Sequence, residues 1–68
     1  MKQISGKDFS ALLQRLGWLL VRIHGSHHIH MKEGRPERIS VPVHGNKPLN
    51  SGLLKHFMKI ADIDETDL

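Results

Sequence analysis

The sequence has no cysteine among its 68 residues. A disulfide framework and a thiolate metal site are therefore both excluded. Because disulfides mark oxidising compartments, the absence of cysteine agrees with a reducing cytoplasm, which is the location we expect.

Long apolar runs are missing as well. No segment approaches the roughly 20 apolar residues needed to cross a membrane, and the N-terminus lacks the apolar core of a signal peptide. A chain this short forms one domain that buries only about 60% of the surface exposed by its unfolded form. It has no room for two lobes around a deep cleft, so a large substrate must lie across an open surface.

Acidic residues are scarce in most of the chain. Lysine and arginine number 10 against 7 acidic residues, which gives a net charge of +3. Four acids, Asp62, Asp64, Glu65 and Asp67, fall at the C-terminus. The rest is therefore more basic than the net charge suggests. A polyanion is a sensible partner, and an ordinary solvated surface fits the charge equally well.

Apolar spacing predicts a helix at each end of the chain. Ser5 is placed to cap the first helix, with Asp8 three residues later as in a capping box, and Gly17 to end it. The second helix is expected to begin after Asn50 or Ser51. The apolar stripes of these helices are Phe9, Leu12, Leu13 and Leu16, and Leu53, Leu54, Phe57, Met58 and Ala61.

Three segments between the helices are rich in strand formers and are separated by glycine-containing turns. They span residues 18–24, 27–33 and 38–44. Pro42 cannot donate a ladder hydrogen bond, so the third strand should lie at a sheet edge. The order α-β-β-β-α predicts an α+β fold, with a three-stranded antiparallel sheet and two helices on one face. We expect residues 1–63 to form this domain and 64–68 an acidic tail, although Asp62–Glu65 also has the spacing of a helix start.

Alternation along the strands predicts which face each side chain occupies. Ile39, Val41 and Val43 must face the helices. The same rule turns the apolar residues of the other strands inward, namely Leu19, Val21, Ile23, Ile29 and Met31. The second face would then be open to solvent, and it would carry Arg22, His24, His28, His30, Lys32, Arg38 and His44.

Three hypotheses could explain why these histidines cluster. His28 and His30 could share a metal ion with His24 or His44, but no acid is obviously placed to orient the rings, and chance clustering is the simpler reading. A tag remnant is discounted, because the cluster is internal. Acid–base chemistry on RNA is the third reading, since neutral histidine can accept a proton from a ribose 2′-hydroxyl and imidazolium can protonate the leaving oxygen.

Two motifs favour the last reading. Gly25-Ser26-His27-His28 and Val41-Pro42-Val43-His44-Gly45-Asn46-Lys47 resemble the HicA family of small toxins. The same is true of Ser5-Gly6-Lys7 and of Leu16-Gly17-Trp18. Further matching positions are Arg22, Leu49, Gly52, Leu54, Lys55 and Lys59, so the resemblance runs from about Lys2 to Ile63. It implies a fold like the double-stranded-RNA-binding domain, a ribonuclease that cleaves messenger RNA, and a neutralising antitoxin of the HicB type.

The resemblance also implies that His28, which closes the Gly-Ser-x-His motif, is the catalytic proton-transfer residue. Gly25 would form the tight turn that presents it. The candidate RNA contacts are Arg22, Ser26, His30, Lys32 and Lys47. His30 departs from the family pattern, because many relatives carry an aromatic residue there, and Asp62 replaces the usual helix-ending glycine. The second acid–base group stays open between His30, His24, a lysine and water, whereas His44 is expected to support its loop.

The sequence thus predicts a metal-independent endoribonuclease toxin that needs no cofactor and has mRNA and an antitoxin as partners. A non-catalytic RNA-binding module with the same basic face is the alternative. A third reading is a protein-interaction domain whose surface exists to be covered by its partner.

Overall fold

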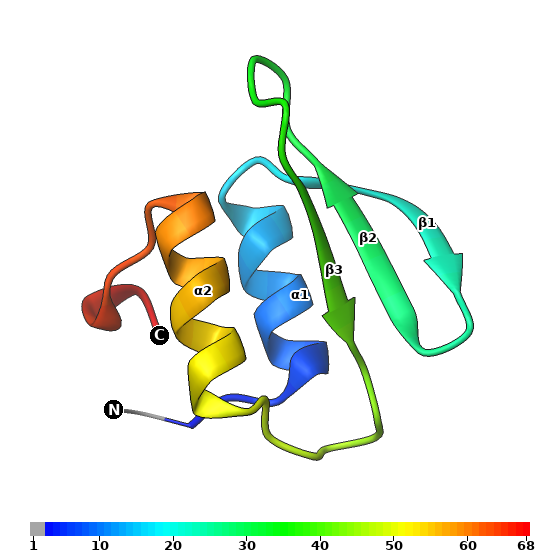
Figure 1. Cartoon of the computed structure of the whole chain (residues 1–68), viewed down its shortest axis with the longest axis vertical. Coiled ribbons are helices and arrows are strands. Elements are labelled where there is room, and N and C mark those ends of the chain that lie inside the picture. Colours follow the sequence, from blue (N-terminus) through cyan, green and yellow to red (C-terminus); the bar gives the residue numbers. More distant parts are fainter. Residues whose placement is uncertain (1–2) are drawn as a thin grey trace.

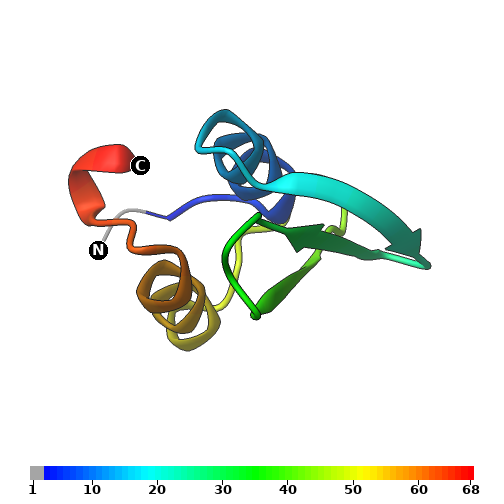
Figure 2. The ribbon, with the colours of Figure 1, turned by 90° about the horizontal axis from the view of Figure 1, so that it is seen from above.

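The computed structural model describes residues 3–68 and contains the predicted order of elements. These are helix α1 (Gly6–Arg15), strands β1 (Leu19–His24), β2 (His27–Met31) and β3 (Arg38–Pro42), helix α2 (Ser51–Ala61) and a 3₁₀ helix η1 (Glu65–Asp67). The strands form an antiparallel sheet in the order β1-β2-β3. Both helices pack on the same side of it (Figures 1 and 2). The predicted α+β fold is therefore confirmed.

The strands end earlier than the sequence pattern suggested. Lys32 already belongs to the turn after β2, where its carbonyl accepts from the Arg35 N–H at 3.0 Å. Val43 has left β3, and its N–H donates to the Ser26 carbonyl at 2.7 Å. β3 is an outer strand, as Pro42 indicated. No helix within residues 3–68 has the length and apolar character needed to cross a bilayer.

Local signals position both helices as expected. The Ser5 hydroxyl accepts from the Asp8 N–H at 3.1 Å, and the Asn50 side chain accepts from the Gly52 N–H at 2.9 Å. Gly17 takes the left-handed conformation that ends α1, with φ of 97°. Leu16 is 38% exposed, because it caps the helix instead of continuing its stripe.

The core lies between the helices and the sheet. Phe9 of α1 and Phe57 of α2 stack with ring centroids 5.8 Å apart. Trp18 is buried beside them, and Ile39 and Val41 of β3 are inaccessible to solvent. Burying such side chains is the main source of stability in a domain this small.

The C-terminal residues fold against this core. Asp62 ends α2 in the left-handed conformation, and its carboxylate accepts from Arg35 at 3.2 Å. Arg35 also donates to the Ile60 carbonyl, which ties the β2–β3 turn to the end of α2. Asp64 caps η1, and Leu68 packs against the core cluster. Residues 64–68 therefore include an ordered helical turn as well as acidic side chains.

The two faces of β2 are the reverse of the sequence prediction. His28 pairs with Val41 and His30 with Ile39. Direct partners in an antiparallel ladder project from the same face. Since Ile39 and Val41 are buried, both histidines project toward the helices, and Ile29 projects from the open face. The prediction that His28 and His30 lie on the open face is wrong.

β1 also departs from simple alternation. The register shifts between Leu20 and Arg22, as in a β-bulge, so that Arg22 lies opposite Ile29 and Ile23 opposite His28. Leu19 is 65%, Val21 49% and Ile23 57% exposed. Leu19 lies opposite Met31 on the open face, so its predicted inward orientation is wrong, and Val21 is exposed at the bulge. Ile23 lies opposite His28 and projects from the helix side as predicted, although it stays exposed. Trp18, just before the strand, takes the buried position instead.

Candidate functional site

The two motifs at residues 25–28 and 41–47 meet at one end of the sheet, at the lower right of Figure 1. There the turn between β1 and β2 touches the loop that leads from β3 to α2. The Val43 N–H donates to the Ser26 carbonyl at 2.7 Å, and His27 pairs with Pro42. Residues more than a dozen positions apart in the sequence are thus joined through the backbone.

Gly25 shapes the turn. His24 pairs directly with His27, which leaves Gly25 and Ser26 as a two-residue hairpin loop. Gly25 has a φ of 61°, and Ser26 does not have a positive φ. Glycine at the first of two central positions is the signature of a type II′ turn, whose twist matches that of the strands. The predicted turn is present, and β2 starts two residues after Gly25.

The N-terminus of α1 packs at the same end of the sheet. A Cβ on Gly6 would lie 2.0 Å from the Pro42 carbonyl oxygen, so only glycine allows this approach. The first turn of α1, including Lys7, therefore lies beside the end of β3. The sequence interpretation did not single out Lys7 as a site residue. The one sequence feature that could have pointed to Lys7 is its place next to Gly6 in the Ser5-Gly6-Lys7 motif.

His28 occupies the second position of β2 on the helix side. Its neighbours across the ladder are Val41, which is buried, and Ile23, which is largely exposed. His28 itself is half-buried. Its imidazole therefore lies at the margin of the helical layer and keeps contact with solvent, although it projects from the face opposite to the one predicted.

His30 is fully buried between α1 and the sheet. Its Nδ1 lies 3.0 Å from the Ile39 carbonyl, and its Nε2 lies 2.7 Å from the Ser10 hydroxyl. A carbonyl oxygen can only accept, so Nδ1 carries the proton and Nε2 accepts from Ser10 in the neutral ring. Burial of a polar side chain is tolerated when its hydrogen bonds are made, which explains why alternation failed here. Because His30 is inaccessible to solvent, it cannot contact RNA in this structure, and the predicted RNA contact of His30 is wrong.

The pKa of His30 is lowered by its burial, although the hydrogen bond to Ile39 opposes this effect, and the positive charge of a protonated His28 lowers the pKa further. The neutral ring is thus the native form. The unfolded chain binds the proton more readily, so stability is full above the ordinary histidine pKa near 6.5 and falls as the pH drops below it.

We expect the protein to lose about 1.4 kcal/mol of stability per pH unit from His30 as the pH falls from about 6.5 toward the lowered value. The measurement is urea unfolding between pH 7.5 and 5. The His30→Phe variant keeps an aromatic ring at this position, somewhat larger than imidazole, and removes the titration, so its stability should depend less on pH. Its Ser10 hydroxyl retains a bond from the Gln14 amide at 3.3 Å. Equal pH dependence in the two proteins would contradict the assignment.

The other predicted RNA contacts divide into two groups. Ser26 lies in the β1–β2 turn, and Lys47 lines a hollow of about 210 Å³ together with Pro42 and His44. Arg22 projects from the opposite face of the sheet to His28. Lys32 lies past the far end of β2, where its ammonium donates to the Leu16 carbonyl at 3.1 Å. The structure therefore brings Ser26 and Lys47 to the end of the sheet that holds His28, whereas Arg22 lies on the opposite face and Lys32 at the far end.

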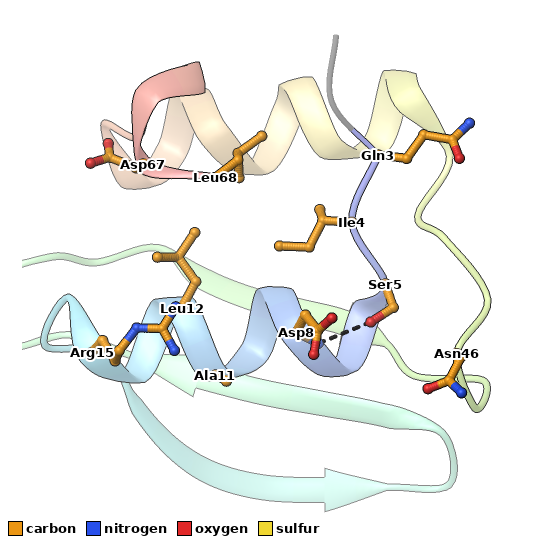
Figure 3. Close-up of a pocket in the computed structure, with 10 residues that line it drawn as sticks. All are labelled: Gln3, Ile4, Ser5, Asp8, Ala11, Leu12, Arg15, Asn46, Asp67 and Leu68. Atoms are coloured by element: carbon orange, nitrogen blue, oxygen red, sulfur yellow. Dashed lines mark hydrogen bonds between the residues drawn. The ribbon is translucent and has the colours of Figure 1, made fainter.

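Two further features lie outside this site. A second hollow, of about 470 Å³, separates α1 from the C-terminus and contains none of the predicted RNA contacts (Figure 3). Asp8, Arg15 and Asp67 contribute its charged groups. Within residues 3–68, no three histidine or acidic side chains are grouped in a way that could hold a metal ion.

Comparisons with known proteins identify the family. No curated protein matches the chain. The family described as the HicA toxin of bacterial toxin–antitoxin systems matches residues 6–63, from the first residue of α1 to the buried Ile63. This match includes every element that builds the site around His28 and all but a few residues at each end, and so the chain belongs to the HicA toxin family.

Proposed function

We propose that this toxin is an endoribonuclease that cleaves messenger RNA and uses His28 as its proton-transfer group. Membership of a toxin family supports a damaging activity, and the position of His28 supports its chemistry. The ring is half-buried, reachable from solvent, and placed where the two motifs and the N-terminus of α1 converge. This convergence is the observation on which the proposal depends.

The proposed reaction uses the nucleophile that RNA already carries. The ribose 2′-hydroxyl attacks the adjacent phosphorus, and the bond from phosphorus to the 5′ oxygen breaks. Either a neutral His28 accepts the hydroxyl proton while water protonates the departing 5′ oxygen, or a protonated His28 protonates the departing oxygen while water accepts the hydroxyl proton. The products are a 2′,3′-cyclic phosphate and a new 5′-hydroxyl, so neither a metal ion nor a covalent enzyme intermediate is required.

Positive charge around His28 suits a phosphate in this reaction. Lys7 belongs to the first turn of α1, whose N-terminus carries a partial positive charge, and Lys47 extends from the β3–α2 loop. No aspartate or glutamate occurs from residue 9 to residue 32. Cations placed near a phosphate stabilise the negative charge that grows in the transition state.

The family implies an antitoxin partner, and we propose that it is of the HicB type and meets the toxin in the cytoplasm. A toxin that cleaves messenger RNA would otherwise arrest the cell that makes it. Neutralisation requires the partner to keep RNA away from the end of the sheet that holds His28.

The test is an RNA-cleavage assay with the unaltered protein in the presence of a chelator. We expect single-stranded messenger RNA to be shortened, with 2′,3′-cyclic phosphate on the new 3′ ends. The rate should fall as salt is added, because phosphate contacts release counterions. RNA that is bound but keeps its length would instead favour the non-catalytic RNA-binding module.

A further inference from the structure

β1 forms an edge of the sheet and exposes apolar side chains along most of its length. It pairs only with β2, so its other edge carries backbone N–H and C=O groups that no described strand covers. Leu19, Val21 and Ile23 are each about half exposed or more. Within residues 3–68 the other exposed large hydrophobic side chain is Leu16, which is 38% exposed and lies at the end of α1, shortly before this strand.

The opposite edge of the sheet is built differently. β3 contains Pro42, which cannot donate a ladder hydrogen bond, and its exposed side chains are Arg38 and Ser40. Proline and charge are the usual means by which a protein prevents an edge strand from pairing with another chain. β1 also exposes Arg22 and His24, but it has no proline and exposes three large aliphatic side chains, so an added strand would find hydrogen-bonding and apolar contacts on β1 that β3 lacks.

Charge indicates the chemistry of a strand that would fit on β1. The strand carries Arg22 and His24, and the segment from residue 9 to residue 32 has three Lys and Arg residues and no acid. On the open face Arg38 lies on β3, two strands away from Leu19. A partner strand with apolar residues facing Leu19 and Val21 would bury these side chains, and acidic residues near Arg22 would pair with its positive charge.

We propose that β1 is the docking site of the antitoxin, which adds an acidic and apolar β-strand to this edge of the sheet. This inference rests on the proposed function, because it takes the partner to be the neutralising antitoxin. In such β-augmentation the main-chain hydrogen bonds supply affinity, and the side chains supply specificity.

An added strand would also lie close to His28. Ile23 is the direct neighbour of His28 on the ladder, and the added strand would lie next to Ile23. With a spacing of about 4.8 Å between strands, its backbone would lie about 10 Å from that of β2. Side chains on its helix-facing side would extend over Ile23 toward the imidazole and obstruct RNA.

RNA and a second copy of the chain fit this edge less well. Single-stranded RNA binds to aromatic platforms and cationic grooves, whereas β1 exposes aliphatic side chains and an unpaired backbone edge. A second copy would bring two strands of the same positive charge together, and like charges on directly opposite residues destabilise a sheet. An acidic protein strand is therefore the occupant that the surface favours.

The experiment measures the affinity of the full chain for the HicB-type antitoxin that the proposed function names. In the test variant, Leu19→Gln is combined with Val21→Gln, and Leu16→Gln is the matched control outside the strand. We expect the double variant to bind about 100-fold more weakly, because two apolar contacts are lost, and the control to bind within about threefold of the unaltered protein. Melting curves verify that each variant folds.

A second measurement uses the unaltered protein and does not depend on any variant. Amide hydrogen exchange of residues 19–24 should slow at least about tenfold in the complex, because an added strand protects the outer edge of β1. Equal affinity of the double variant, protection confined to other segments, or self-association of the chain through β1 would each overturn the proposal.

RNA cleavage by the free proteins separates this inference from the proposed function. The double variant should cleave RNA as the unaltered chain does, and it should no longer be inhibited at antitoxin concentrations that inhibit the control. If no protein cleaves RNA while the double variant still loses antitoxin binding, then the ribonuclease proposal fails and the docking site stands.

Discussion

Replacing His28 with alanine is expected to lower RNA cleavage by about 10²–10⁴-fold, the usual contribution of a positioned acid–base group. The ring lies on the helix side of β2 but is only half-buried, so its loss should cost little packing. The effect should appear in the maximal rate more than in RNA affinity, since Lys7 and Lys47 at the same end of the sheet are unchanged. The measurement is single-turnover cleavage of a labelled RNA, with binding determined in parallel.

His27 offers a matched control for this variant. It is the preceding residue of the same strand, it is exposed, and it lies opposite Pro42 on the other face of the sheet. His27→Ala removes the same imidazole from the same turn and should cleave RNA within about threefold of the unaltered chain, since it removes no group from the helix side. Loss of activity in both variants alike, or an active and folded His28→Ala protein, would show that the proton-transfer group lies elsewhere.

The Gly6→Ala variant should show the largest loss of stability. A Cβ at this position would lie 2.0 Å from the Pro42 carbonyl oxygen and 3.3 Å from the Val43 Cα, and both are backbone atoms that cannot rotate away. The helix must therefore shift from the end of β3, at a cost of about 1–3 kcal/mol or somewhat more. A domain of this length has only about 3–10 kcal/mol of stability in total. Urea or thermal unfolding measures the loss.

Gly52→Ala is the control for Gly6→Ala. Gly52 is also near the start of a helix, and its nearest neighbour is the Asn50 Oδ1 at 3.2 Å, which belongs to a side chain that can adjust. Alanine is the better helix former, so this change should shift stability by less than about 1 kcal/mol. Equal stability of the Gly6 and Gly52 variants would contradict the tight contact with Pro42. A shifted α1 should also slow RNA cleavage, because Lys7 moves with it.

The sequence alone determined the features that depend on neighbours along the chain. Ser5 and Asn50 cap their helices through hydrogen bonds that span two or three residues. Gly17 and Gly25 have the positive φ that their turns require. The family motif named His28 as the catalytic candidate, and the order of elements followed from apolar spacing, since these patterns need no knowledge of distant contacts.

The tertiary structure alone decided which face of the sheet each histidine occupies. His30 is buried because Ser10, twenty positions earlier, and the carbonyl of Ile39 satisfy its ring nitrogens. A bulge in β1 reverses the alternation that would have placed Val21 inward. Alternation assumes that polar groups avoid the core and that strands pair without insertions. Whether the first assumption holds depends on the available hydrogen-bond partners, and whether the second holds depends on strand register. Both are set only when segments far apart in the sequence come together.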